Sequence, residues 1–216
     1  MWFQDAAFPI DASVANELYA SVDALRHAGV QVDEVHPEVD LPAVHRLYRQ
    51  LLEPILALGA PPALVARLEA AAARPEDGDH EASFARNALI RHADWLVAHE
   101  FRVQLKAVLA RFFRDYDVLL CPVTPVAAFP HDHREPQSAR SLRVNGAPRS
   151  YMDLMGWACL ATAAWHPATS MPVGRTPEGL PVGLQVIGPY LEDLTPIDFA
   201  GRLSELVGGF ERPPGF

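Results

Sequence analysis

The stretch from Pro167 to Pro189, PATSMPVGRTPEGLPVGLQVIGP, decides the fold because it predicts two neighbouring strands of a buried sheet. β-Branched and small side chains fill residues 168–173 and 182–187, and such side chains suit a pleated, buried surface. The connection over residues 174–181 is rich in glycine and proline and is long for a simple hairpin. On spacing alone, the stretch fits a core hairpin without any chemistry.

Two motifs of the chain resemble those of the amidase signature family. The string P-A-x-S-x-P-x-G, followed by G-L-P-V-G-L-Q-V-I-G-P, resembles the C-terminal half of that family. YDVLLCPVTP at Tyr116–Pro125 resembles the family's strand and loop upstream, and the order and approximate spacing of the motifs also agree. The resemblance covers essentially the whole chain. It implies an α/β fold, the C-terminal part of the amidase signature fold, with a mixed β-sheet covered by helices.

The resemblance also implies hydrolysis of carboxamide C–N bonds by a Ser–cis-Ser–Lys triad. A serine hydroxyl needs a positioned base, and a lysine can act as that base only where a buried setting lowers its pKa. In the family the triad lies in the N-terminal half, which includes a Gly- and Ser-rich segment. This chain has no such segment, and its single lysine, Lys106, falls within a predicted amphipathic helix. We therefore expect no catalytic residue here and interpret the chain as a C-terminal amidase fragment, inactive alone.

Composition excludes several classes of protein. The chain has 216 residues, of which half are apolar, and a formal net charge of −9. Its arginines are spread along the chain, whereas nucleic-acid binding needs a basic patch. Apolar runs are too short for a spanning helix, and no signal-peptide pattern is present. Cys121 and Cys159 stand alone in apolar surroundings, which predicts buried free thiols in a cytoplasmic protein.

Apolar periodicity predicts an α/β unit that is followed by a helical region. Asp11 is the expected N-cap of a helix to about residue 28, and Gly29 its stop, before a short strand at residues 30–35. A helical insertion over residues 43–114 should then contain helices at 43–58, from Pro61 to about residue 74, and at 82–114, the last being one long helix or two abutting ones. We expect one domain over residues 1–216, with strand 117–121, a buried helix at 151–164 and a final helix at 197–206 after the two decisive strands.

The resemblance gives candidate substrate-binding residues, because the loop after strand 117–121 borders the substrate cleft in the family. Trp165 replaces a glycine that is common in the family motif N-x-x-G-x-P-A, and Thr162 replaces its asparagine. A large aromatic side chain in place of that glycine is expected to fill space near the cleft. The candidates are Thr124, Pro125, Tyr151, Trp157 and Trp165.

Residues 126–150 show little periodicity and predict a mobile loop over the cleft, with a turn at Val144–Gly146. His131, Asp132 and His133 in this loop raise the alternative of a small metal-dependent hydrolase. Two histidines and an aspartate without a distant third ligand are a weak signal, so we expect neither a metal nor another cofactor.

Two further expectations concern function and assembly. The first alternative to an amidase portion is a non-catalytic remnant or binding module that keeps the scaffold. Expected partners are a small-molecule amide, once an N-terminal half completes the site, and a second copy of the chain, but neither nucleic acid nor membrane. A cut sheet exposes an edge and an apolar face, so the isolated chain should be marginally stable or oligomeric.

Overall fold

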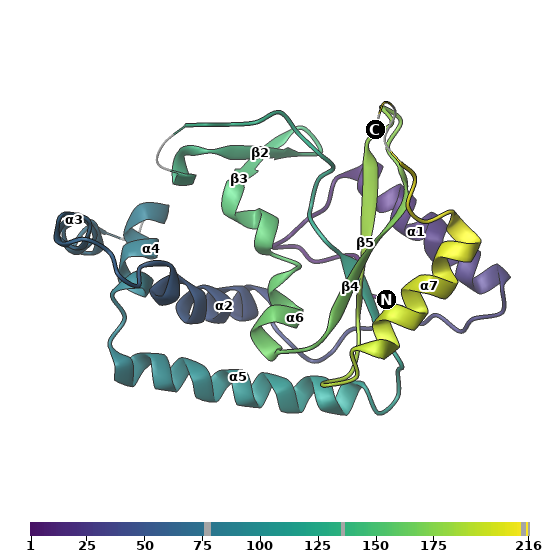
Figure 1. Cartoon of the computed structure of the whole chain (residues 1–216), viewed down its shortest axis with the longest axis horizontal. Helices are drawn as coiled ribbons and strands as arrows, with labels where there is room; N and C mark the ends of the chain where they lie inside the picture. The colour runs from purple at the N-terminus through teal and green to yellow at the C-terminus, as the bar shows by residue number, and fades with distance from the viewer. Residues whose placement is uncertain (76–78, 135–136, 213–214, 216) are drawn as a thin grey trace.

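The centre of the fold is a three-stranded antiparallel sheet in the order β1-β5-β4. The computed structural model describes residues 1–75, 79–134, 137–212 and 215. Its strands are β1 (Leu119–Pro122), β4 (Ala168–Arg175) and β5 (Pro181–Ile187), with Cys121 opposite Gln185 and Ser170 opposite Gln185 on the other side. The two strands predicted from the decisive stretch are thus confirmed, and β5 lies between its two partners (Figure 1).

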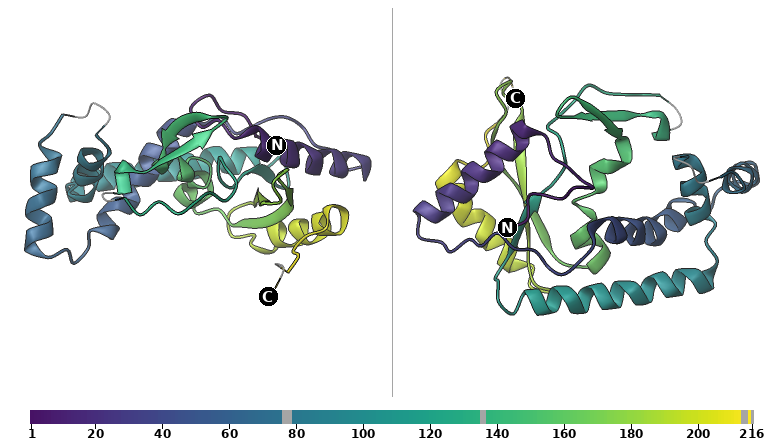
Figure 2. Two further views of the ribbon diagram at one scale, coloured as in Figure 1. Left: turned by 90° about the horizontal axis from the view of Figure 1, so that it is seen from above. Right: turned by 180° about the vertical axis from the view of Figure 1, so that it is seen from behind.

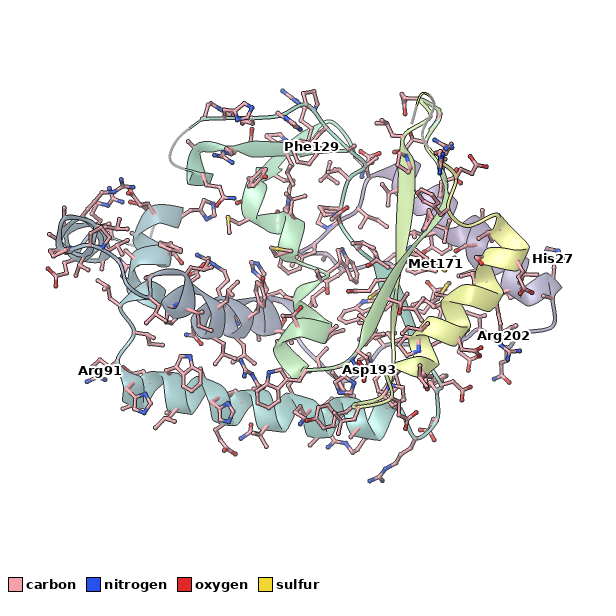
Figure 3. All side chains as sticks on the ribbon, viewed as in Figure 1. His27, Arg91, Phe129, Met171, Asp193 and Arg202 are labelled. Carbon is pink, nitrogen blue, oxygen red and sulfur yellow. The ribbon has the colours of Figure 1, made fainter. Side chains whose placement is uncertain are left out.

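Helices cover both faces of this sheet, as the alternating strand residues require. Leu120 and Val186 pack with α1 (Ala12–His27) and α7 (Leu194–Val207) on one face, where Met171 of β4 also lies (Figure 3). Leu119 and Ile187 face the opposite side, towards α2 (Leu41–Leu56), α5 (His92–Phe112) and α6 (Cys159–Ala164). Figure 2 shows α1 and α7 together at one end of the molecule, beside the sheet.

The expected helical insertion is present and divides into an inner and an outer part. α2 and α5 belong to the core beside the sheet, whereas α3 (Pro62–Ala72) and α4 (His80–Ala88) lie farther out (Figure 1). The predicted helix at 82–114 is two helices, α4 and α5, which the sequence left open. α2 continues through Pro54 and ends two residues later, because a proline in the last turn removes only one hydrogen bond. Part of the loop at residues 75–80 lies outside the described residues.

α1 begins and ends where the sequence predicts. The Asp11 side chain accepts a hydrogen bond from the backbone N–H of Ser13, and Gly29 has a φ of +84° just beyond the C-terminus. Such a positive φ is open to glycine and disfavoured for other residues, so Gly29 lets the chain reverse at this point.

The predicted strand at 30–35 is wrong. Residues 30–35 are irregular and partly exposed, although their apolar residues alternate. The place beside β1 is taken by the N-terminal segment, whose Trp2 N–H donates to the Leu120 carbonyl over 2.9 Å. The Met1 amine in turn donates to the Asp33 carbonyl over 2.6 Å, so residues 30–35 contact that segment without forming a ladder.

Residues 126–150 also differ from the prediction, because they contain a β-hairpin. β2 (Ser141–Val144) and β3 (Ala147–Ser150) pair in an antiparallel register around Asn145 and Gly146, both at positive φ. This is the two-residue turn that an Asn-Gly pair favours. Two 3₁₀ helices flank the hairpin, η1 (Gln137–Ala139) and η2 (Tyr151–Met155), and η2 interrupts the single helix that was expected at 151–164.

The expected α/β class is confirmed, and every strand pairing among the described residues is antiparallel. No helix within the described residues is long and apolar enough to cross a membrane.

Candidate functional site

A hollow of about 530 Å³ lies where the N-terminal segment, the start of α1 and the β2–β3 turn meet. Its walls combine apolar residues with a few polar groups, which is the usual make-up of a small-molecule site. The lining residues are Phe3, Gln4, Asp5, Ala6, Pro9, Ile10, Ala12, Ala15, Tyr19 and Asn145.

Asp11 and Asn145 hold the two sides of this groove together. The Asp11 carboxylate accepts hydrogen bonds from the Asn145 backbone N–H at 3.0 Å and from the Ser13 hydroxyl at 2.8 Å. The Asn145 side chain in turn accepts from the Ala12 N–H at 2.8 Å and donates to the Ile10 carbonyl at 3.1 Å. Partial burial raises the pKa of Asp11, but the hydrogen bonds from Asn145 and Ser13 outweigh it and leave that pKa lowered.

Two further polar groups are fixed within the groove. The Gln4 side-chain amide donates to the Tyr19 hydroxyl over 2.8 Å. The Asp5 carboxylate accepts from the backbone N–H groups of Ala7 and Phe8 at 2.9 and 3.3 Å, which bends the N-terminal segment into the floor of the groove. The Ala7 carbonyl accepts a hydrogen bond from Arg149 of β3, so the hairpin is also tied to this floor.

Pro125 and Trp157 support the groove from behind without lining it. The Pro125 carbonyl accepts from the Asp11 N–H at 2.8 Å, at the entry to α1. Trp157 is 1 % exposed, and its indole N–H donates to the Phe8 carbonyl at 3.0 Å. Because its ring is enclosed by the core, Trp157 is a positioning residue in this structure, and no part of it is accessible to a ligand.

Thr124 and Tyr151 lie at the margins of the same region. The Thr124 hydroxyl donates to the Val126 carbonyl over 2.8 Å and so closes the turn after β1. Tyr151, the first residue of η2, packs edge-on against Phe129 with ring centroids 6.2 Å apart.

Trp165 is separate from the other four candidates. It ends α6 with φ +58° and ψ +32°, the left-handed conformation that glycine adopts most easily. This backbone explains why glycine suits the position in the family motif. The Trp165 side chain lies against α5, where Arg102 stacks on it, and is 45 % exposed.

The groove contains no activated nucleophile. Among the described side chains, no serine, threonine or cysteine is hydrogen-bonded to a histidine or lysine. Burial raises the pKa of both Cys121 and Cys159 to about 12, so both thiols stay protonated and unreactive at neutral pH. They are free and buried, as the sequence predicts.

The His131–Asp132–His133 segment offers little to a metal. The Asp132 carboxylate is bound by Arg134 at 2.6 Å, and this hydrogen bonding lowers the pKa of Asp132 to about 2. In the part of the chain that the structure describes, no three His, Cys, Asp or Glu residues are grouped so as to hold a metal ion.

Comparison with known proteins identifies the fold. The sequence profile of the Amidase family matches residues 1–195. The chain belongs to the amidase family. A crystal structure described as an amidase superposes with a TM-score of 0.72 and 22 % identity, over 94 % of this chain and 44 % of that one.

Curated relatives in the amidase family are longer than this chain. The fatty acid amide hydrolase of Arabidopsis thaliana is 27 % identical over 220 residues, which is 100 % of this chain and 33 % of the relative. The fatty acid amide hydrolase of Medicago truncatula is 33 % identical over 122 residues, 56 % of this chain and 19 % of the relative. A glutamyl-tRNA(Gln) amidotransferase from an Exiguobacterium species is 31 % identical over 116 residues, 54 % of this chain and 22 % of the relative. The chain thus spans a third or less of these relatives.

The residues that line the groove were not predicted from the sequence. Asp11 was recognised only as a helix cap, and the Asn-Gly pair only as a turn. Both signals were correct locally, but neither reveals that the two sites meet across 134 positions of sequence.

Proposed function

We propose that this chain is the substrate-binding portion of an amidase and that the groove at residues 3–15 and Asn145 receives part of a carboxamide substrate. The catalytic Ser–cis-Ser–Lys apparatus would come from a portion of the amidase fold that this sequence does not contain. The chain would correspond to the C-terminal portion, as a single domain with a helical insertion.

One observation carries this proposal: the amidase profile matches residues 1–195, yet the chain aligns with only a third of the length of its Arabidopsis relative. A serine amidase needs a nucleophile with a base in hydrogen-bond reach. The described residues bring together groove walls, fixed amide and carboxylate groups and apolar surface, but no such pair. They are therefore suited to positioning a substrate rather than to attacking it.

The geometry of the groove supports binding of an amide. Asp11 and Asp5 already accept backbone hydrogen bonds, so both carboxylates are held in place rather than left to reorganise. Fixed polar groups at an apolar wall orient a ligand at low entropic cost. Pro125 and Trp157 hold this wall from behind, and Thr124 and Tyr151 flank it.

The direct test joins the chain to the missing portion. The DNA upstream of Met1 is read in frame, and any segment with a lysine and a Gly- and Ser-rich stretch is produced with the chain, as one polypeptide or as two. We expect carboxamide hydrolysis from the combination and none from either part. Hydrolysis by the chain alone, or none by a folded combination on a broad panel of amides, would refute the proposal.

A matched pair of variants tests the groove within that combination. Asn145→Ala removes the link to α1 and should raise KM for the amide substrate at least fivefold. Arg143→Ala, two positions earlier on an exposed stretch of β2, should leave KM unchanged.

The second candidate is a binding module without catalysis, favoured by the lack of a nucleophile–base pair among the described side chains. The two candidates differ in one result: an amidase portion gains hydrolysis when it is completed, whereas a binding module binds amides and hydrolyses none under any combination.

A further inference from the structure

A cluster of cations and aromatic rings lies away from the groove, between α5, the end of α6 and the turn after β5. The Arg102 guanidinium stacks 4.4 Å from the centre of the Trp165 ring. The Lys106 ammonium lies 3.5 Å from the centre of the Tyr190 ring and 5.1 Å from that of Trp165. Both rings are accessible, since Trp165 is 45 % and Tyr190 is 39 % exposed.

These two cations have no anionic partner. No carboxylate within the described residues lies at ion-pair distance from Arg102 or Lys106, although the chain as a whole has a net charge of −9. Most other arginines of the described chain do pair with a carboxylate, including Arg91 at the start of the same helix region, which binds Asp94 at 2.7 Å. Two unpaired cations, one turn apart on α5, therefore form a local positive site on an acidic protein.

Buried polar atoms without partners gather around the same place. Arg102 Nε, His99 Nδ1 and His166 Nε2 are buried and make no hydrogen bond. His166 is 7 % exposed and lies between the Phe113 and Tyr190 rings, 5.3 and 6.1 Å away. The His99 ring lies 5.7 Å from that of Trp165. Buried polar groups normally have a partner, so three unsatisfied nitrogens in one cluster point to a missing ligand or ion.

The Trp165 backbone adds an independent sign. A bulky residue in the left-handed conformation is an outlier, and outliers of this kind concentrate at ligand sites. Here the conformation places the indole beneath Arg102, where the stacked guanidinium keeps its edge free to bind two oxygens at once.

We propose that Arg102, Lys106 and the Trp165 and Tyr190 rings form a binding site for an oxyanion, the carboxylate or phosphate group of a small molecule. Arg102 binds the oxyanion through the edge of its guanidinium, and Lys106 supplies a second charge from one turn farther along α5. The Trp165 and Tyr190 rings hold both cations in place and exclude water from one side of the site. This site is independent of the proposed amidase function, because it shares no residue with the groove.

Tryptophan resonances test the proposal directly on the full chain. The chain is labelled with ¹⁵N in its tryptophan indoles and titrated with inorganic phosphate, acetate and benzoate at constant ionic strength, with chloride as the reference. We expect a saturable shift of the Trp165 indole with at least one oxyanion and not with chloride. The indoles of Trp2 and Trp157, both buried elsewhere, should stay in place and report that the fold is unchanged.

Variants on α5 separate the site from general electrostatics. Arg102→Gln and Lys106→Gln should each weaken the binding by about tenfold, the size of one lost charge-assisted contact. Arg111→Gln, in the last turn of the same helix, should change it by less than twofold. Arg102→Lys keeps the charge and loses the fork, so it should fall between the two.

Three results would overturn the proposal: no saturable shift with any oxyanion, an equal shift with chloride, or equal losses in Arg102→Gln and Arg111→Gln. Should Arg102→Gln alter the Trp2 and Trp157 resonances, the comparison of Lys106→Gln with Arg111→Gln decides instead. A response to phosphate alone or to carboxylates alone identifies which group the site prefers.

Discussion

The sheet core and the outer helical pair, α3 with α4, are held together in different ways. The core joins segments far apart in the sequence, and fully buried side chains such as Leu184, Val186 and Leu203 fill it. The outer pair joins neighbouring helices around only three buried apolar residues, Leu68, Ala71 and Ala85. A small local cluster cannot contribute as much free energy of unfolding as an extended core.

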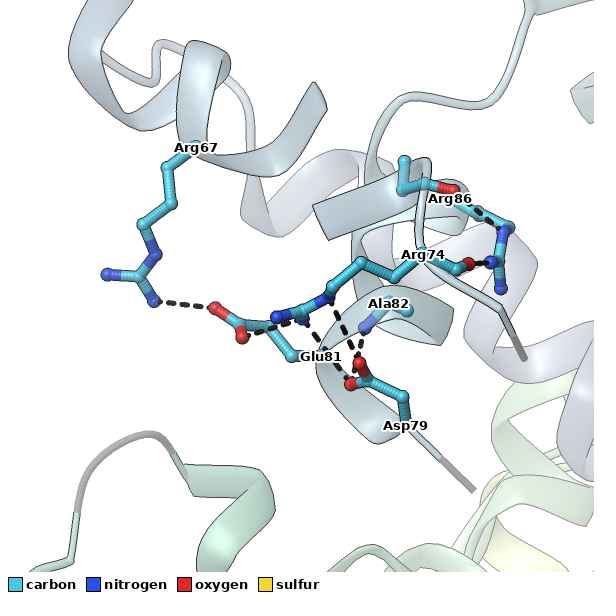
Figure 4. A network of polar contacts seen from close by, with 7 residues as sticks. Arg67, Arg74, Asp79, Glu81, Ala82 and Arg86 are labelled. Carbon is cyan, nitrogen blue, oxygen red and sulfur yellow. Dashed lines mark hydrogen bonds and ion pairs between the residues drawn. The ribbon is translucent and has the colours of Figure 1, made fainter. Parts of the chain in front are cut away.

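Ion pairs make up much of what remains in the outer pair. Arg74 binds Asp79 at 3.0 Å and Glu81 at 2.8 Å, and Arg67 binds the other oxygen of Glu81 at 3.1 Å (Figure 4). Arg86 donates to the backbone carbonyls of Ala72 and Arg74. Exposed ion pairs contribute little, so we infer that the outer pair opens more easily than the core.

The largest effect that separates the two regions should come from apolar truncation. Leu184→Ala in β5 should lower the free energy of unfolding by about 3 kcal/mol, because it leaves a cavity in a rigid core. Leu68→Ala in α3 should open only α3 and α4, since its contacts are local. Urea denaturation with hydrogen exchange measures both. An equal drop in the global transition for both variants would show that the two regions unfold as one.

The next effect concerns the junction between the two regions. Glu53 of α2 is 3 % exposed and accepts hydrogen bonds from Arg49 and from Asn87 of α4, both at 2.7 Å. Glu53→Ala should cost about 3 kcal/mol or slightly less, because Arg49 is left largely buried without its partner. The exposed Glu69→Ala on α3 is the control and should change the denaturation midpoint little. Similar midpoints for the two variants would remove Glu53 from the junction.

A pH effect should follow from His45, on the core side of α2. Burial, together with the charges of Arg49 and Arg46, lowers the pKa of His45 to about 4. The unfolded state therefore binds more protons than the folded state between pH 6.5 and 4, and stability falls as the pH falls through that range. The loss should be on the order of 2 kcal/mol. His45→Gln should flatten this dependence in acid denaturation, and the exposed His27→Gln should leave it unchanged.

The smallest effect belongs to the ion pairs of the outer pair. Glu81→Gln should raise amide exchange rates in α3 and α4 by only about twofold, with the difference disappearing in high salt. Rates in β5 should not change. A large, salt-independent effect would mean that this network stabilises the whole chain.

Sequence patterns predicted the elements whose signals are local. The Asp11 cap, the Gly29 stop, the Asn-Gly turn and the two strands of the decisive stretch were all found, because each depends on its own side chains. The family itself was also recognised from those strands and the Tyr116–Pro125 motif. The strand at 30–35 failed because pairing depends on a partner, and the Trp2 backbone occupies the edge of β1 instead.

The site was harder to predict than the fold. Trp157 was a candidate for the pocket, but the structure buries its ring and gives only its N–H to the groove. Trp165 was expected near the cleft, but a left-handed φ directs it onto α5. Both outcomes depend on which face of a short helix meets which neighbour. Residue type and spacing do not carry that information.

The place of β5 in the sheet has a consequence for synthesis on the ribosome. β5 pairs with both β1 and β4, so no sheet of three strands can close until residues 181–187 have left the exit tunnel. α1, made far earlier, must wait with its apolar face uncovered, whereas α3 and α4 can pair almost as soon as they emerge. Slow, long-range closure of this kind favours aggregation of nascent chains. Yield should therefore depend on chaperone supply and translation speed more strongly than the stability of the finished fold would suggest.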